Sequence, residues 1–183
     1  MVFEERFVGR EKELAVLERA ASKETFQLVV VYGRRRVGKT TLLAHFCKGR
    51  RALFFTAQEQ SDKDNLNDFS TRIATCFGLP QGMGFSSWDS AFEFLAEKAQ
   101  GEEFVFVFDE FPYAVQANSA LPSKLQIAID HAFKGTSLCM VLCGSNQGFM
   151  ESNVLGKKSP LHGRRTAQMK IEPFGYRDTA RFL

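Results

Sequence analysis

One stretch of eight residues constrains the fold of this chain more than any other feature. It reads Gly-Arg-Arg-Arg-Val-Gly-Lys-Thr over residues 33–40 and matches the pattern G-x-x-x-x-G-K-[ST]. The apolar run over 27–32 predicts a buried strand before it, and apolar residues at helical spacing over 40–48 predict a helix after it. A strand, loop and helix in this order place backbone N–H groups and a helix dipole around a polyphosphate. The sequence therefore predicts a phosphate-binding loop rather than a chance match in a glycine-bearing turn.

The positions within this loop have different expected roles. Gly33 and Gly38 allow backbone conformations and a close approach that a Cβ would forbid. Lys39 is expected to reach the β and γ phosphates, and the Thr40 hydroxyl to ligate Mg²⁺. The residues expected to bind the phosphates of ATP or ADP are Gly33, Arg34, Arg35, Arg36, Val37, Gly38, Lys39, Thr40 and Thr41.

Length and composition are those of one globular domain. The chain has 183 residues, enough for a full hydrophobic core, and 44% of them are hydrophobic. No apolar run approaches the ~18–20 residues needed to span a bilayer. The first residues lack the basic and apolar regions of a signal peptide. We therefore expect a cytoplasmic protein with no membrane partner.

The cysteines give no sign of a metal site or a disulfide framework. They contain no C-x-x-C pair, and the histidines are scattered along the chain. Two of the cysteines, four residues apart, are expected on one face of a strand. We expect all four to be packing residues in a reducing compartment: Cys47, Cys76, Cys139 and Cys143.

Strand and helix patterns alternate along the chain. Strands are expected at 27–32, 52–57, 103–108, 137–143 and 168–171. Helices are expected around residues 14–21 and at 40–48, 65–77, 88–98, 118–133 and 175–183, with a polar connection at 58–64 and an early interruption by Pro122. This alternation predicts an α/β fold in three layers, with a mainly parallel five-stranded sheet between helices. Phosphate sites in such sheets lie at the carboxyl ends of the strands, where residues 33–40 fall.

A pair of carboxylates ends the third predicted strand. Asp109 and Glu110 follow the apolar run 104–108. Asp109 is expected to hold Mg²⁺ through its water shell, and Glu110 to act as general base on the attacking water. An acidic pair at a strand end is common by itself. Here it falls about seventy residues after a phosphate loop, on another strand of one sheet, and so favours ATP hydrolysis.

Two shorter segments give weaker signals. Ser145 and Asn146 follow the fourth predicted strand, where a small polar side chain could touch a γ-phosphate or orient water, although such residues are common in turns. Arg164 and Arg165 precede the fifth strand. A guanidinium there could stabilise transition-state charge, or the pair could form a solvated basic turn. Spacing alone does not decide between these interpretations.

Together these segments resemble the ATPase domain of the AAA+-related prokaryotic ATPases that open with a GRExEL segment. The matches come in family order and cover nearly the whole chain: residues 7–11 with Leu14, 32–40, 108–113, 143–145, 159–166 and 173–174. The resemblance implies a P-loop NTPase fold of the AAA+ type, with ATP and Mg²⁺ as ligands.

The resemblance also implies roles for residues outside the loop. The segment Phe7–Arg10 would border the adenine, with Val8, Gly9 and Arg10 as the expected contacts. Ser145 or Asn146 would occupy the sensor-1 position, and Asn146 departs from the Gly-Ser-Ser that many relatives have there. Arg164 or Arg165 would be an arginine finger, acting in trans if the protein forms a homo-oligomer.

Members of this family usually continue into a helical lid, a winged-helix region and often a nuclease-like domain. None of these is recognisable in residues 1–183. The resemblance therefore implies an ATPase core over 1–183 that is truncated before the lid. No sensor-2 arginine is assigned.

The leading hypothesis is Mg²⁺-dependent ATP binding and hydrolysis by the core of a larger cytoplasmic ATPase. The alternative is a nucleotide-gated binding module with little intrinsic hydrolysis. DNA association is suggested by resemblance to initiator-like AAA+ proteins, but a net charge of +3 supports it weakly. A small-molecule phosphoryl-transfer enzyme is disfavoured, because no acceptor site is recognisable and Asp109 with Glu110 suits water as the nucleophile.

Overall fold

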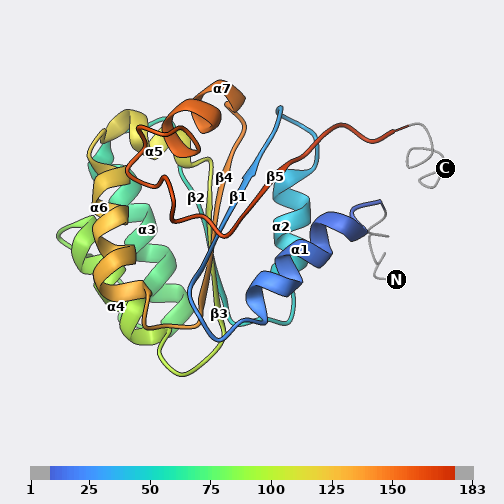
Figure 1. Ribbon diagram of the computed structural model, residues 1–183. Coiled ribbons are helices and arrows are strands. Elements are labelled where there is room, and N and C mark those ends of the chain that lie inside the picture. The colour runs from blue at the N-terminus through green and yellow to red at the C-terminus, as the bar shows by residue number, and fades with distance from the viewer. Residues whose placement is uncertain (1–8, 176–183) are drawn as a thin grey trace, which may run out of the picture.

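Five parallel strands form one sheet through the centre of the computed structural model, which describes residues 9–175 (Figure 1). The strands are β1 (Gln27–Tyr32), β2 (Ala52–Thr56), β3 (Phe104–Asp109), β4 (Leu138–Gly144) and β5 (Ala167–Lys170). Their order across the sheet is β2-β3-β4-β1-β5, and all four neighbouring pairs are parallel. The α/β fold class predicted from the sequence is confirmed.

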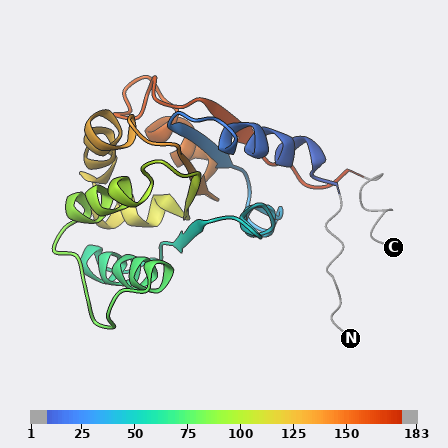
Figure 2. The ribbon, with the colours of Figure 1, turned by 90° about the horizontal axis from the view of Figure 1, so that it is seen from below.

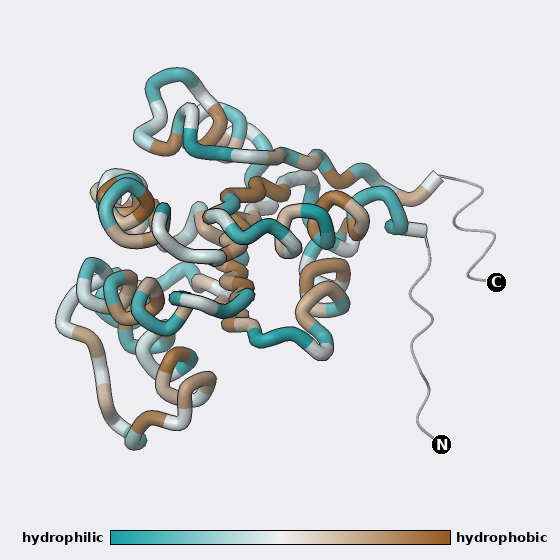
Figure 3. The backbone as a smooth tube through the Cα atoms, turned by 60° about the horizontal axis from the view of Figure 1, so that its bottom comes forward, coloured by the Kyte–Doolittle hydropathy of each residue, from teal (hydrophilic) through white to brown (hydrophobic). Residues whose placement is uncertain are grey.

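The three central strands are apolar because helices cover both of their faces. Every residue of β1, β3 and β4 is buried, as expected for the interior of a parallel sheet. Figure 3 shows this hydrophobic centre with more hydrophilic connections around it. Since successive side chains point to opposite faces, Phe106 and Phe108 pack on one side of β3 and Val105 and Val107 on the other.

Helices form a layer on each side of the sheet (Figures 1 and 2). On one side lie α1 (Glu11–Ala21) and α2 (Lys39–Cys47), which pack on the valine face of β3. The other side is covered by α3 (Asp62–Phe77), α4 (Trp88–Lys98), α5 (Phe111–Ala117) and α6 (Leu121–Ala128). The predicted three-layer arrangement is therefore present.

Helix α3 begins three residues earlier than predicted. The sequence predicts a polar connection over 58–64, but the helix begins at Asp62. Ser61 is its N-cap and accepts a hydrogen bond from the Asp64 backbone N–H at 3.1 Å. The acidic side chains in the first turn also interact favourably with the positive end of the helix. Polar residues here start a helix rather than a loop.

The helix predicted over 118–133 is present from Leu121 to Phe133, so its end is confirmed and its start lies three residues later than predicted. Pro122 does not interrupt it but lies in the first turn of α6, where a missing N–H costs no helical hydrogen bond. Helix α6 continues into a π-helical turn, η1 (Ile129–Phe133). Three further helical segments were not predicted: α5, α7 (Gln147–Phe149) and a second π-helical turn, η2 (Met150–Val154). The helix predicted over 175–183 lies outside the described residues, apart from Gly175.

The abundant phenylalanines build the core between the sheet and the α3–α6 layer. The ring of Phe69 lies 5.0 Å from that of Phe55, 5.2 Å from Trp88 and 5.4 Å from Phe106, measured between centroids. Phe69 is fully buried. Aromatic rings bury large apolar areas and form favourable pair contacts, so this cluster stabilises the α3–α6 layer on the sheet.

The cysteines are free, and only some of them are packing residues. Cys139 and Cys143 are buried on one face of β4, as predicted, and burial raises the pKa of Cys139 to about 12. Cys47 is half-buried. The prediction is wrong for Cys76, which is exposed in the last turn of α3.

Within residues 9–175, no helix combines the length and apolar character needed to cross a membrane.

Replacing Phe69 by Ala is expected to lower the free energy of unfolding by about 3–5 kcal/mol, because it leaves a cavity among five neighbouring rings. Urea unfolding followed by fluorescence measures this change. Met83→Ala is the control, because its side chain is 47% exposed and its loss should change stability by less than about 0.5 kcal/mol. Equal losses in the two variants would contradict the core assignment.

Candidate functional site

The predicted phosphate loop lies at the carboxyl edge of the sheet, between the end of β1 and the start of α2. Gly38 is the N-cap of α2 and has a φ of 89°, in the left-handed region that glycine tolerates. Gly33 is packed against the segment after β5, and a Cβ built on it would lie 2.3 Å from the Ile171 carbonyl oxygen. The loop therefore has its glycines where a side chain would be strained or would clash.

The side chain of Lys39 folds back across the loop. Its Nζ donates to the Gly33 carbonyl at 2.9 Å and to the Arg34 carbonyl at 2.7 Å, and the residue is only 5% exposed. The three arginines 34–36 are exposed around it, as is Thr41 in the first turn of α2. The loop thus gathers one buried ammonium and three exposed guanidinium groups beside a helix N-terminus, a setting that favours a polyphosphate.

The two predicted magnesium ligands are in direct contact. The Thr40 hydroxyl donates to Asp109 Oδ2 at 3.0 Å. Asp109 is 2% exposed, and its Oδ1 accepts from the Glu110 backbone N–H at 3.0 Å. The nearby thiol of Cys143 stays protonated. Its pKa is raised well above the usual range, mainly by burial and to a smaller extent by the charge of Asp109.

This hydroxyl and carboxylate suit Mg²⁺. Both offer hard oxygen ligands, and Mg²⁺ is usually held by one or two protein groups, waters and substrate phosphates. Within residues 9–175 no group of three or more His, Cys, Asp and Glu could hold a metal ion by itself. Mg²⁺ at Thr40 and Asp109 would take its remaining ligands from waters and phosphate oxygens.

Glu110 has a strained backbone and a fixed side chain. Its φ of 51° lies in the left-handed region, which is uncommon for a residue with a side chain. The Ser145 hydroxyl donates to its Oε1, and the Ser145 backbone N–H donates to its Oε2 at 3.3 Å. Asn146 instead accepts from the Phe149 backbone N–H and caps α7. Of the two sensor-1 candidates, Ser145 contacts Glu110.

A pocket of about 470 Å³ opens beside Glu110. It is lined by Arg34, Arg35, Glu59, Glu110, Pro112, Tyr113, Gln116, Ser145 and Asn146. Arg35 donates to the Tyr113 hydroxyl across it. No site role was predicted for Glu59, Tyr113 or Gln116. Glu59 could have been found, because it follows β2, whose carboxyl end lies beside that of β3.

Arg10 lies behind the phosphate loop. It is 6% exposed, and its Nη2 donates to the Val37 carbonyl at 2.9 Å and to the Glu172 carbonyl at 2.6 Å. Its Nη1 pairs with Glu13 at 3.1 Å. Gly9 is half-buried, and Val8 lies outside the described residues.

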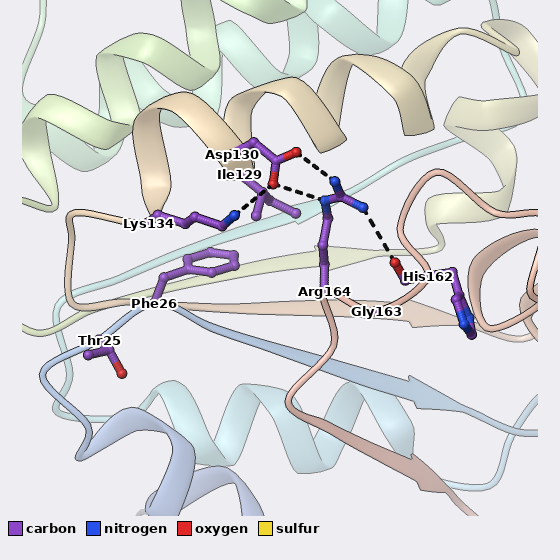
Figure 4. A pocket seen from close by; sticks show the side chains of 8 residues that line it. All are labelled: Thr25, Phe26, Ile129, Asp130, Lys134, His162, Gly163 and Arg164. Carbon is purple, nitrogen blue, oxygen red and sulfur yellow. Dashed lines mark hydrogen bonds and ion pairs between the residues drawn. The ribbon is translucent and has the colours of Figure 1, made fainter.

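Arg164 lies at the opposite edge of the sheet, in a pocket of about 440 Å³ (Figure 4). Its guanidinium holds Asp130 of η1 in two hydrogen bonds of 3.0 and 2.6 Å, and Lys134 approaches the same carboxylate at 3.2 Å. These cations lower the pKa of Asp130 to about 2, and the pair raises the pKa of Arg164. The π-helical turn that carries Asp130 was not predicted.

The Arg164 pocket and the phosphate loop lie at opposite ends of β1. Thr25, another lining residue of this pocket, precedes β1, whereas Lys39 follows β1. A six-residue strand spans roughly 20 Å, so Arg164 cannot reach the phosphate loop of its own chain. Arg165 donates to the Leu155 carbonyl at 3.1 Å. The structure thus gathers Lys39, Thr40, Asp109, Glu110 and Ser145 at one edge and leaves both arginine candidates outside that group.

The class of protein follows from the sheet order, the loop after β1 and the acidic residues at the end of β3, which is separated from β1 by β4. These features make this chain a P-loop ATPase core of the AAA+-related type, as the sequence resemblance implies. The chain belongs to the family described as an ATPase domain predominantly from Archaea, which matches residues 7–183.

This chain spans only part of the length of three similar proteins. The uncharacterized protein MJECL04 of Methanocaldococcus jannaschii is 30% identical over 177 residues, which are 97% of this chain and 38% of that protein. The Walker-type ATPase PABY2304 of Pyrococcus abyssi has a TM-score of 0.62 at 21% identity, over 98% of this chain and 57% of that one. Drosophila ORC bound to DNA has a TM-score of 0.69 at 18% identity, over 94% and 45%. These structural similarities concern the fold alone.

The Asp130–Arg164 pair predicts a pH dependence of stability. Because the pKa of Asp130 is lowered from 3.8 to about 2, its contribution is complete above pH about 4 and is lost as the pH falls towards about 2. The difference in urea midpoint between wild type and Asp130→Asn should therefore shrink over this range. Glu93→Gln, at an exposed position of α4, serves as control. A difference that stays constant down to pH 2 would contradict the pair.

Proposed function

We propose that this chain binds ATP with Mg²⁺ and hydrolyses it as the core of a larger ATPase. The observation that carries the proposal is the contact between Thr40 and Asp109 at 3.0 Å. It joins the helix after the phosphate loop to the end of a different strand, beside the candidate base Glu110. A fold that only bound phosphate would not need these carboxylates.

The loop residues account for nucleotide binding. The backbone N–H groups of residues 33–41 would surround the β and γ phosphates, and Lys39 would exchange its two carbonyl contacts for phosphate oxygens. Thr40 and Asp109 would hold Mg²⁺, which when bound neutralises charge on the β and γ phosphates.

Glu110 is proposed as the general base of hydrolysis. Its carboxylate lines the 470 Å³ pocket, where a water molecule can stand between it and the γ-phosphate. In the proposed step the water oxygen forms a bond to the γ-phosphorus while the bond to the β–γ bridging oxygen breaks. Glu110 takes the proton of the water, and the products are ADP and inorganic phosphate.

A nucleotide-gated binding module with slow hydrolysis is the second candidate. It is favoured by the two hydrogen bonds from Ser145 to Glu110, which hold the candidate base on the protein rather than on a water molecule. The hydrogen bond from Arg164 to Asp130 also favours slow hydrolysis. If Arg164 of a neighbouring copy acted as an arginine finger, it would first have to leave Asp130. DNA is a possible partner of such a module, since one similar fold is that of ORC bound to DNA.

Lys39→Ala is expected to weaken ATP binding by about tenfold or more, because it removes a charge-assisted contact to the phosphates. Calorimetric titration of Mg·ATP measures the dissociation constant. Lys48→Ala is the matched control, because it removes an exposed lysine at the other end of the same helix. Unchanged ATP affinity in Lys39→Ala would refute the proposed site.

Glu110→Gln is expected to lower the turnover number by about 10²–10⁴-fold while ATP affinity stays unchanged, because the amide cannot accept the proton of water. Steady-state phosphate release and ATP titration measure the two quantities. Glu97→Gln, an exposed site on α4, is the control. Full turnover in Glu110→Gln together with its loss in Glu59→Gln would move the base role to Glu59. No turnover in the wild type would favour the binding module.

A further inference from the structure

The segment that follows β5 touches the phosphate loop at its beginning. The backbone N–H of Ile171 donates to the Tyr32 carbonyl at 2.7 Å. The carbonyl of Ile171 fills the space where a Cβ of Gly33 would be, at 2.3 Å. Figure 2 shows this segment running beside α1. The first residue of the loop is therefore held from behind by backbone that lies far away in the sequence.

Arg10 ties the same segment to the end of the loop. One nitrogen, Nη2, bridges the carbonyls of Val37 and Glu172, which are 27 and 162 residues away. The guanidinium also lies over the ring of Phe174, 4.2 Å from its centroid. We call Arg10, Ile171, Glu172 and Phe174 the loop brace.

The burial of Arg10 indicates that these contacts are specific. Its Nε–H has no hydrogen-bond partner although it is fully buried, an arrangement that is rare for a polar group. The side chain is therefore held in place by its two terminal nitrogens and the Phe174 ring. A guanidinium can do this because its donors lie in one rigid plane.

The hydrogen bond to Val37 also fixes the direction of the next N–H group. No cis peptide bond occurs in the described residues, and the C=O and N–H of a trans peptide point in opposite directions. With the Val37 oxygen turned towards Arg10, the Gly38 N–H must point away from Arg10. A rotation of this peptide would instead turn a carbonyl oxygen towards any bound phosphate and repel it.

We propose that Arg10 is a positioning residue that holds the Val37–Gly38 peptide with its N–H towards the phosphates of the nucleotide. This inference rests on the proposed function and differs from an adenine contact, the role that the family resemblance implies for this segment. It specifies that Arg10 acts on the polyphosphate part of the ligand through the backbone of the loop, and that it does not touch the ligand.

Binding of tripolyphosphate separates the two roles, because this ligand has phosphates and no adenine. We expect Arg10→Ala and Arg10→Lys to weaken ATP, ADP and tripolyphosphate alike, by about tenfold or more. Calorimetric titration with Mg²⁺ measures all three. Arg19→Ala, at an exposed arginine of the same helix, should leave them unchanged. Weaker ATP with unchanged tripolyphosphate would overturn the proposal in favour of an adenine contact.

The NMR chemical shift of the Gly38 amide proton gives a second test, and a general loss of stability would not alter its response to ADP. In wild type the Gly38 proton should shift downfield on adding ADP, and in Arg10→Lys this shift should be reduced while those of Lys39 and Thr40 persist. An equal Gly38 shift in both proteins would overturn the positioning role. If Arg10→Ala does not fold, Arg10→Lys, which keeps the buried charge, carries the test. Failure of the wild type to bind tripolyphosphate and ATP would instead refute the proposed function.

Discussion

The parallel pairing of β3, β4 and β1 is the constraint on which the rest of the structure depends. These strands are neighbours in the sheet although β1 is separated from β3 by about seventy residues. Because parallel strands end at the same edge, their last residues deliver the phosphate loop, the Asp109–Glu110 pair and Ser145 to one place. Every residue of these three strands is buried, and this packing fixes where the strands end. The core therefore determines the geometry of the site.

At the carboxyl edge of the sheet, the side chains of Asp109 and Glu110 are held by hydrogen bonds from neighbouring backbone and side-chain groups. Asp109 accepts from both Thr40 and the Glu110 backbone, and Ser145 supplies two donors to the Glu110 side chain. The loop is supported from behind by Arg10. In the proposed function, these contacts hold Asp109 and Glu110 beside the loop before a nucleotide binds.

Much of the fold and the local part of the site could be predicted from the sequence. The strands were readable because buried parallel strands are continuous apolar runs, and the loop has a specific pattern. The π-helical turn with Asp130 could not be recognised from the sequence, because its hydrogen bonds depart from the 3.6-residue period of an α-helix. The partners of Arg10 and Arg164 were also hidden, since contacts 162 and 34 residues apart leave no local pattern. Ser145 was separated from Asn146 only by its hydrogen bonds to Glu110.

The central claim is that ATP and Mg²⁺ bind at the carboxyl edge of the sheet. Amide hydrogen exchange with and without Mg·ATP tests it most directly, because it reports where a ligand protects the backbone. The account predicts slower exchange in peptides that cover residues 33–41, and a smaller effect around 109–110 and 145. Unchanged exchange in the loop, or protection confined to the opposite edge around Asp130 and Arg164, would contradict it.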